Sequence, residues 1–203
     1  MYLYLRTCSC VAWVDRETSY AVVELPPAAV THWLTLITCG KTDLVSAALK
    51  LTKDLGLANL RYMIYERKNA QFQEYQPSNF FDDARRLGGA MPGRAFRFGE
   101  GSDHHLFLFH LDRPYRPDAK DLTLELLMHG IAPAASRTFM AGAGRARERI
   151  RRSGVWDILP GFKVDDHLFS PMGYSLNAVR DSRYYTIHLT PQPNGSYVSF
   201  ETN

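Results

Sequence analysis

The stretch LFSPMGYSLNAVRDSRYYTIHLTPQPNGSYVSFETN, residues 168–203, decides the fold of this chain. Aromatic and β-branched residues alternate with polar ones along it, which predicts strands over Tyr174–Val179, Tyr184–Thr190 and Ser196–Glu201. Asn194-Gly195 is a typical hairpin turn between the last two of these strands. The C-terminal part of the chain is therefore predicted to form a β-rich, antiparallel layer.

The rest of the chain mixes short strands with a few helices. Helices are predicted over Thr42–Leu55, Ser78–Leu87 and Ala146–Arg152; Gly56 should end the first and Gly88-Gly89 the second. Alternating or β-branched runs predict strands over Thr7–Val14, Ser19–Glu24, Trp33–Thr38, Arg61–Glu66, Arg94–Phe98, His104–Leu111, Leu122–His129 and Phe162–Phe169. Because few helices connect the strands, the predicted fold class is α+β with antiparallel sheets.

The composition is that of an ordinary globular protein. The 203 residues are 45% hydrophobic and 22% charged, enough for one sizeable core or two small halves. The net charge of +3 is too small to indicate nucleic acid, and no apolar run is long enough to cross a bilayer. Cys8, Cys10 and Cys39 lack metal-ligand spacing and fit a reducing compartment. We therefore expect a cytoplasmic protein without a metal, a membrane span or a nucleic-acid partner.

Several motifs follow one another in a characteristic order. They are TCG at Thr38–Gly40, YxRKN at Tyr65–Asn69, DLTLELLM at Asp121–Met128, SGVWDILPG at Ser153–Gly161, and the terminal run GYSxN…TIHxTP…SYVSFETN. From about Cys10 to Asn203 the chain resembles the eukaryotic-type S-adenosylmethionine decarboxylases. The resemblance implies an αββα sandwich of two antiparallel sheets with helices outside. It also implies a single domain over residues 1–203, with pseudo-repeat halves of roughly 1–130 and 131–203.

The chain is shorter than the family pattern at both ends. The family's first strand and helix, and the elements after SYVSFETN, have no counterpart in it. The sandwich is therefore expected to be incomplete relative to the family. Exposed sheet edges and apolar faces are unstable unless they are covered, so a homodimer or a partner subunit is expected.

The resemblance assigns catalytic roles to Cys39, Ser175 and His188. In the family the cysteine of TCG is the general acid, while the serine of GYS and the histidine of TIH serve self-processing. A thiol can protonate a carbanion once a neighbour adjusts its pKa, and a Ser and a His on neighbouring strands could form a hydrogen-bonded pair. The alternatives are a small buried apolar Cys39 and a structural His188.

Two further groups of residues match ligand-binding positions of the family. Phe169 matches an aromatic that stacks on adenine, although it could be an ordinary core residue. Gln192 stands where the family has a carboxylate for the ribose hydroxyls, and Glu24 is a third substrate-binding candidate. The acidic residues that bind putrescine in some members match Asp121, Glu125 and Glu201. Without a diamine, close carboxylates would repel one another and tend to protonate or recruit water.

The processing site departs from the family pattern. YAVVELPP, residues 20–27, falls on the family's Y-x-L-S-E-S-S, so Leu25 stands where the family has a serine. In the family, the hydroxyl of that serine cuts the backbone after the preceding glutamate, here Glu24, and the serine residue becomes the pyruvoyl group. Ser19 and Thr31 are out of register. We expect an uncut chain with no pyruvoyl and no other cofactor. An aldehyde cofactor on Lys41 would be another electron sink, but nothing else in the sequence indicates one.

Two functions compete on this evidence. The first is a repurposed small-molecule enzyme that uses the old decarboxylase pocket for acid/base or cyclisation chemistry. The second is a catalytically dead regulatory partner of a true S-adenosylmethionine decarboxylase, the carboxy-lyase of polyamine (spermidine) biosynthesis. A decayed copy without function, or residual decarboxylation by another route, accounts less well for the intact strand periodicity and the missing serine.

Overall fold

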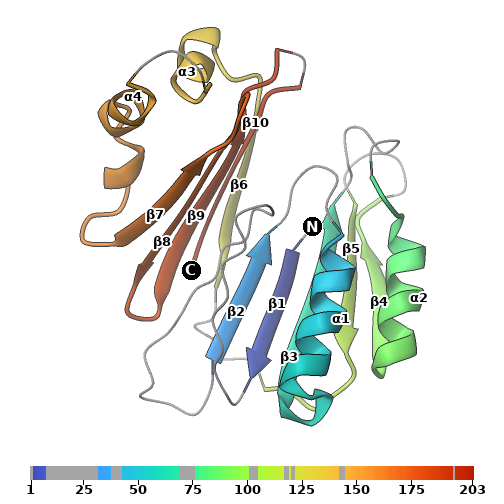
Figure 1. Cartoon of the computed structure of the whole chain (residues 1–203). Helices are drawn as coiled ribbons and strands as arrows, with labels where there is room; N and C mark the ends of the chain where they lie inside the picture. Colours follow the sequence, from blue (N-terminus) through green and yellow to red (C-terminus); the bar gives the residue numbers. More distant parts are fainter. Residues whose placement is uncertain are drawn as a thin grey trace. The chain divides into compact units, whose positions relative to one another are not determined.

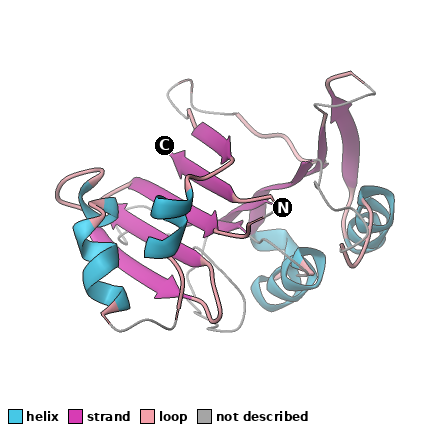
Figure 2. Cartoon of the chain, turned by 90° about the horizontal axis from the view of Figure 1, so that it is seen from above, coloured by secondary structure: helices cyan, strands magenta, loops and turns pink. Residues whose placement is uncertain are grey.

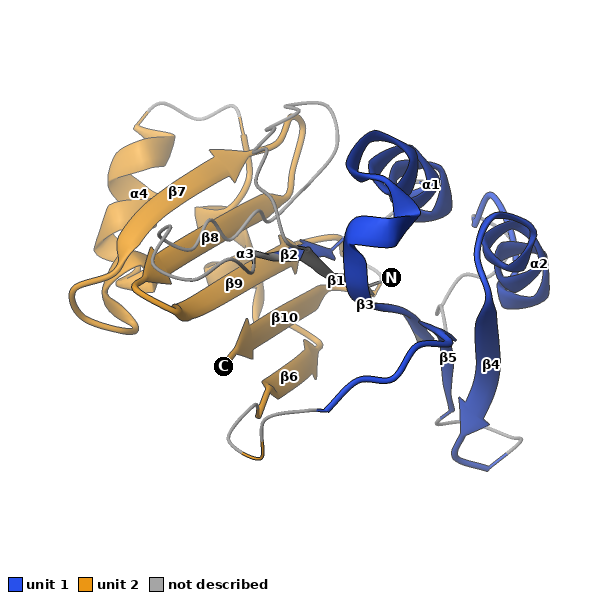
Figure 3. Cartoon of the chain, turned by 90° about the horizontal axis from the view of Figure 1, so that it is seen from below, with its two compact units in different colours: residues 1–116 blue, residues 117–203 orange. Residues whose placement is uncertain are grey.

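The structure is a computed structural model that describes residues 2–7, 32–37, 43–68, 76–100, 105–116, 119, 122–141, 145–193 and 195–203. Among these residues the chain forms two five-stranded antiparallel sheets (Figure 1), and helices accompany each sheet (Figure 2). The chain splits into two compact units, residues 1–116 and 117–203 (Figure 3), so that each unit holds one sheet. The prediction of two antiparallel sheets with helices is confirmed.

The N-terminal unit has the strand order β2-β1-β3-β5-β4, with antiparallel neighbours throughout. Its strands are β1 (Tyr2–Thr7), β2 (His32–Ile37), β3 (Leu60–Lys68), β4 (Gly93–Phe98) and β5 (Leu106–Leu111). Its helices are α1 (Leu44–Leu55) and α2 (Phe80–Ala90), with a 3₁₀ turn at Leu57–Asn59. Both helices pack on one face of the sheet, where Leu44, Met63, Leu87 and Phe109 share a core.

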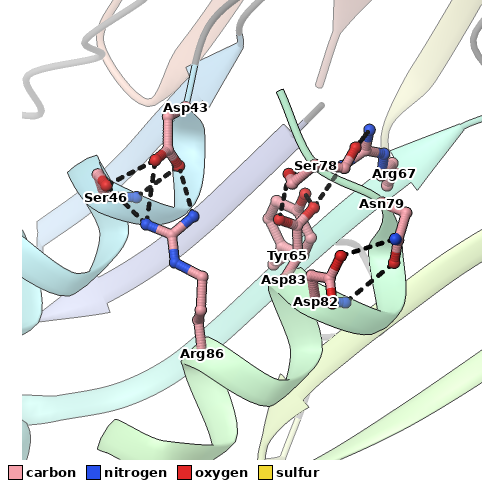
Figure 4. Close-up of polar contacts among 9 residues, drawn as sticks. All are labelled: Asp43, Ser46, Tyr65, Arg67, Ser78, Asn79, Asp82, Asp83 and Arg86. Carbon is pink, nitrogen blue, oxygen red and sulfur yellow. Dashed lines mark hydrogen bonds and ion pairs between the residues drawn. The ribbon is translucent and has the colours of Figure 1, made fainter. Parts of the chain in front are cut away.

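The starts of α1 and α2 follow from local chemistry. Asp43 caps α1 by accepting a hydrogen bond from the Ser46 amide, and Asn79 caps α2 by accepting from the Asp82 amide (Figure 4). The prediction that Gly88-Gly89 ends α2 is wrong, because the helix continues to Ala90. A glycine costs about 1 kcal/mol in a helix. Leu87 and Met91, which flank the glycine pair, are both buried, and this packing favours a helix that runs through the two glycines.

The C-terminal unit has the strand order β6-β10-β9-β8-β7. Its strands are β6 (Leu124–His129), β7 (Lys163–Leu168), β8 (Tyr174–Arg180), β9 (Arg183–Thr190) and β10 (Tyr197–Thr202). Its helices are α3 (Pro133–Thr138) and α4 (Ala146–Arg152), with a 3₁₀ turn at Val155–Asp157. Residues from these helical segments, including Ile150 and Val155, cover one face of the sheet.

Most of the predicted elements agree with the structure. The four strands predicted after residue 161 match β7 to β10, and the helix over Ala146–Arg152 is α4. The first strand begins earlier than predicted, at Tyr2, and α3 was not predicted. The strand predicted over Ser19–Glu24, and the one over Thr7–Val14 beyond its first residue, lie outside the described residues. None of the helices formed by the described part of the chain has the length and apolar character that crossing a membrane requires.

Candidate functional site

The two faces of the C-terminal sheet have opposite character. Side chains alternate between the faces of a strand, so neighbouring residues of β8, β9 and β10 point in opposite directions. One face carries the core residues Tyr174, Leu176, Ile187, Leu189 and Phe200. The other face, which we call the polar face, carries Ser175, Asn177, Thr186, His188, Ser199 and Glu201. Most of these polar side chains are nevertheless buried, so their hydrogen bonds matter to stability.

The strand register arranges the polar face in two rows. Ser175, His188 and Ser199 are direct cross-strand partners on β8, β9 and β10. Asn177, Thr186 and Glu201 form the second row, two residues along each strand. Directly opposed residues of an antiparallel pair have Cβ atoms about 4.5–5.5 Å apart, within reach of short polar side chains. The register alone therefore brings a serine, a histidine and a carboxylate together.

Ser175 and His188 form a buried pair. The Ser175 Oγ lies 2.9 Å from the His188 Nδ1, and the two residues are 8% and 3% exposed. Burial lowers the pKa of His188 from 6.5 to about 4, because the protein interior disfavours the imidazolium. The imidazole is therefore neutral near pH 7, and it can accept one hydrogen bond and donate another. The structure thus brings these two predicted site residues into contact.

A change in pH should reveal the burial of His188. Between pH 6.5 and about 4 the unfolded chain binds a proton at this histidine that the folded chain does not bind. The free energy of unfolding should therefore fall as the pH is lowered through this window, by about 1.4 kcal/mol per pH unit from this group. Urea unfolding of the wild type and of His188→Gln across the window measures the difference. Equal pH slopes for the two proteins would contradict the burial of a neutral histidine.

Two of the three acidic candidates lie at the β6 side of the same face. Glu201 is 1% exposed, and its Oε1 accepts a hydrogen bond of 2.5 Å from the Tyr184 hydroxyl. Glu125 on β6 is the cross-strand partner of Glu201 and is half-buried. Sequence reasoning missed Tyr184, although its place two residues before Thr186 puts it on the polar face. The third acidic candidate, Asp121, lies outside the described residues.

The remaining candidates are spread more widely. Phe169 directly follows β7 and is half-buried; its ring meets that of His167 edge-to-face, with the centroids 4.5 Å apart. His167 is the cross-strand partner of Ser175, so Phe169 lies close to the first row of the polar face. Gln192 is exposed, two residues after the end of β9.

Several predicted positions cannot be placed. Cys39, Glu24 and Leu25 lie outside the described residues, so both the predicted acid and the processing position remain predictions. Among the residues that are described, no group of three or more His, Cys, Asp and Glu side chains could hold a metal ion.

Two antiparallel sheets, each with helices on one face, and a buried polar face on the second sheet define the chain as an α+β protein. The model of the adenosylmethionine decarboxylase family matches residues 19–203. The chain belongs to this family.

Individual relatives agree with this assignment. The S-adenosylmethionine decarboxylase proenzyme of Xenopus laevis is 35% identical and aligns with 95% of this chain and 61% of its own length. The proenzyme of Dictyostelium discoideum is 31% identical and aligns with 93% of this chain and 52% of its own length. The crystal structure of the Trypanosoma brucei AdoMetDC-delta26 monomer superimposes with a TM-score of 0.61, at 24% identity, over 83% of this chain and 65% of that one. This chain thus spans between half and two thirds of the length of these relatives.

Proposed function

We propose that this chain is a member of its family that does not process itself, carries no pyruvoyl group, and uses the polar face as an acid/base site for a small molecule. The observation that carries the proposal is the buried contact between Ser175 and His188. Burying polar groups costs free energy unless they are hydrogen-bonded, and apolar residues would fill a strand interior at lower cost. A buried, uncharged Ser-His pair is suited to holding or moving a proton at Nδ1.

The residues at the processing position do not fit a pyruvoyl group. Forming that group requires a serine hydroxyl to attack the preceding carbonyl, and the chain has Glu24-Leu25-Pro26-Pro27 there. Leucine has no oxygen with which to form an ester. In the proposal, Cys39 serves as a proton donor and Phe169 as an aromatic contact for the ligand.

The ligand need not be S-adenosylmethionine itself. Gln192 can hydrogen-bond a sugar but brings no negative charge toward a sulfonium group. Glu125 and Glu201 retain carboxylates at one side of the polar face, which suits a ligand with an ammonium group. A small cationic metabolite, bound beside a neutral imidazole, is the class of ligand that these residues favour.

A denaturing mass spectrum of the purified protein tests the processing proposal. We expect one species with the mass of the intact chain, because residue 25 has no hydroxyl to start the cleavage. A matched sample treated with a carbonyl-reactive hydrazine should gain no mass, because no pyruvoyl carbonyl is present. Two fragments that break between Glu24 and Leu25, one of them with a terminal carbonyl, would refute the proposal.

Calorimetry tests the small-molecule site. The wild type is titrated with S-adenosylmethionine and then with putrescine, beside His188→Gln and the control Ser182→Ala, which lies in the exposed turn between β8 and β9. Binding near 1 μM corresponds to about −8 kcal/mol. Binding that survives in the control but is lost in His188→Gln supports the proposal. The absence of heat with both ligands would exclude them and favour the second candidate.

The second candidate is a regulatory partner of a complete decarboxylase, and β6 favours it. This strand stands at the end of its sheet order, and Leu124, Leu126, Leu127 and Met128 are all exposed. Exposed apolar residues on an edge strand commonly mark a protein interface. Copurification with a full-length relative would support this function. Cys39→Ala would then leave the function intact, whereas a small-molecule enzyme should lose most of its activity.

A further inference from the structure

The Ser175–His188 contact is part of a longer chain of hydrogen bonds on the polar face. The other ring nitrogen of His188, Nε2, lies 3.4 Å from the Thr186 Oγ1. The Thr186 hydroxyl in turn donates to the Asn177 Oδ1 over 2.9 Å. The four side chains thus connect in the order Asn177, Thr186, His188, Ser175, over two adjacent strands.

The direction of each hydrogen bond in this series follows from the Asn177 amide oxygen, which accepts the last of them. A side-chain amide oxygen can only accept, so the single hydroxyl proton of Thr186 is used in its bond to Asn177. The Thr186 oxygen can then offer only a lone pair to His188. The Nε2 atom must therefore carry the imidazole proton and donate it. In the neutral ring this leaves Nδ1 unprotonated, so it accepts the hydroxyl proton of Ser175.

We propose that Asn177 and Thr186 are positioning residues that hold His188 in the tautomer protonated at Nε2, which makes Nδ1 the acceptor for the Ser175 proton. In the opposite tautomer Nδ1 would be the donor, and the Ser175 oxygen would give a lone pair to the ring. The two residues would thus decide what the Ser175 hydroxyl offers a ligand: two acceptor lone pairs in the first tautomer, or one lone pair and the hydroxyl proton in the second.

The pairing of β8 with β9 fixes which of these four side chains lie opposite one another. Ser175 and His188 are direct cross-strand partners, and so are Asn177 and Thr186. The two pairs stand on the same face of the hairpin formed by β8 and β9, which a short turn at Asp181-Ser182 closes. Thr186 is 2% exposed and His188 3% exposed, so bulk water has little access to replace either partner. The hydrogen bonds within the hairpin are therefore the main influence on the tautomer.

The inference rests on the proposed function in one respect, that the Ser175–His188 pair is the reactive pair. Its test does not depend on any reaction. Nitrogen NMR of isotope-labelled protein at neutral pH distinguishes the two tautomers, because protonated and unprotonated ring nitrogens differ widely in chemical shift. The chain has seven histidines, so the signals of His188 are assigned by their loss in His188→Gln.

In the wild type we expect the Nε2-protonated form to dominate. Thr186→Val keeps the shape of the side chain and removes the acceptor. The ratio of the Nε2-protonated to the Nδ1-protonated form should therefore fall about fivefold, which corresponds to the free energy of one typical hydrogen bond. Thr186→Ser should restore the ratio. Thr190→Val, two residues after His188 on the same strand, is the matched control and should leave it unchanged.

Asn177→Ala provides a second test, since it leaves Thr186 in place but frees its hydroxyl to rotate. The ratio should again fall, and a circular dichroism spectrum like that of the wild type establishes that the variant is folded. A wild-type His188 protonated at Nδ1, or a ratio that neither variant changes, would overturn the inference. If no ligand binds while the tautomer responds as described, the proposed function fails and the positioning role stands.

Discussion

Replacing Arg67 with methionine is expected to lower the free energy of unfolding of the N-terminal unit by about 3–5 kcal/mol. Arg67 on β3 forms an ion pair of 2.5 Å with Asp83 on α2, and the two side chains are only 9% and 1% exposed. Without the guanidinium, the Asp83 carboxylate would stay buried without its compensating charge. Urea unfolding, with hydrogen exchange to separate the two units, measures the loss.

The contacts around Asp83 explain why the expected cost is large (Figure 4). Its Oδ2 accepts hydrogen bonds from the Tyr65 hydroxyl, over 2.5 Å, and from Arg67, while its Oδ1 accepts from the Ser78 hydroxyl over 2.6 Å. Arg67 also donates to the Ser78 carbonyl. Burial, and then the neighbouring Asp83, raise the pKa of Tyr65 far above its usual range, so its hydroxyl stays a donor. Removing one member leaves the others with poorer partners in a low-dielectric interior.

Two comparisons test this explanation. Arg85→Met removes an exposed ion pair with Asp82 on the same helix, 2.8 Å long, and should cost no more than about 1 kcal/mol. Combining Arg67→Met with Asp83→Leu should recover much of the stability, because it removes the isolated buried charge. If Arg67→Met costs no more than Arg85→Met, the buried ion pair has no special role in this unit.

Truncating Leu176 to alanine is expected to lower the free energy of unfolding of the C-terminal unit by about 2–5 kcal/mol. Leu176 is fully buried in the middle of β8, in the core that the sheet shares with Ile150 and Val155. The substitution removes apolar contacts and leaves a cavity. Because β8 is hydrogen-bonded to a strand on each side, its backbone cannot easily move to close that cavity. Urea unfolding of the variant, followed by the near-ultraviolet circular dichroism of its aromatic residues, measures the effect.

Leu126→Ala is the matched control, because both leucines belong to one row across the sheet. Cross-strand pairing connects Leu176 to Ile187, Ile187 to Phe200, and Phe200 to Leu126 on the edge strand β6. Leu126 is 47% exposed, so its truncation should cost about 1 kcal/mol or less. A loss at Leu126 as large as that at Leu176 would mean that β6 is covered in solution, as a protein partner would cover it.

The fold was largely predictable from local patterns. The strands of the C-terminal sheet have clear alternation, and the capping residues Asp43 and Asn79 lie where the first two helices begin. The prediction failed for α3, which has six residues and no side-chain cap, so its local signal is weak. It also failed for the end of α2, because the burial of Leu87 and Met91 depends on tertiary contacts that a glycine pair does not reveal.

The candidate site was predictable only in part. Ser175 and His188 were found through motif resemblance, and the structure places them in contact. Thr186 and Asn177 were missed, because their hydrogen bond follows from the register between β8 and β9. That register is set jointly by the alternation of both strands and by the turn at Asp181-Ser182, so neither strand shows the contact by itself. The Arg67–Asp83 pair was missed for a similar reason. The two residues are 16 positions apart, on a strand and on a helix, so their contact depends on how these elements pack.

The alternation of β9 has a consequence for how this protein could change over time. His188 lies between Ile187 and Leu189, so alternate residues of this one strand belong to the polar face and to the core. Deleting or inserting a single residue in β9 would turn the histidine toward the core and a leucine toward the polar face. Substitutions can alter the chemistry of the site one residue at a time, but length changes in this strand would exchange the two faces at once. New activities on this scaffold should therefore arise at constant strand length, with insertions confined to the turns.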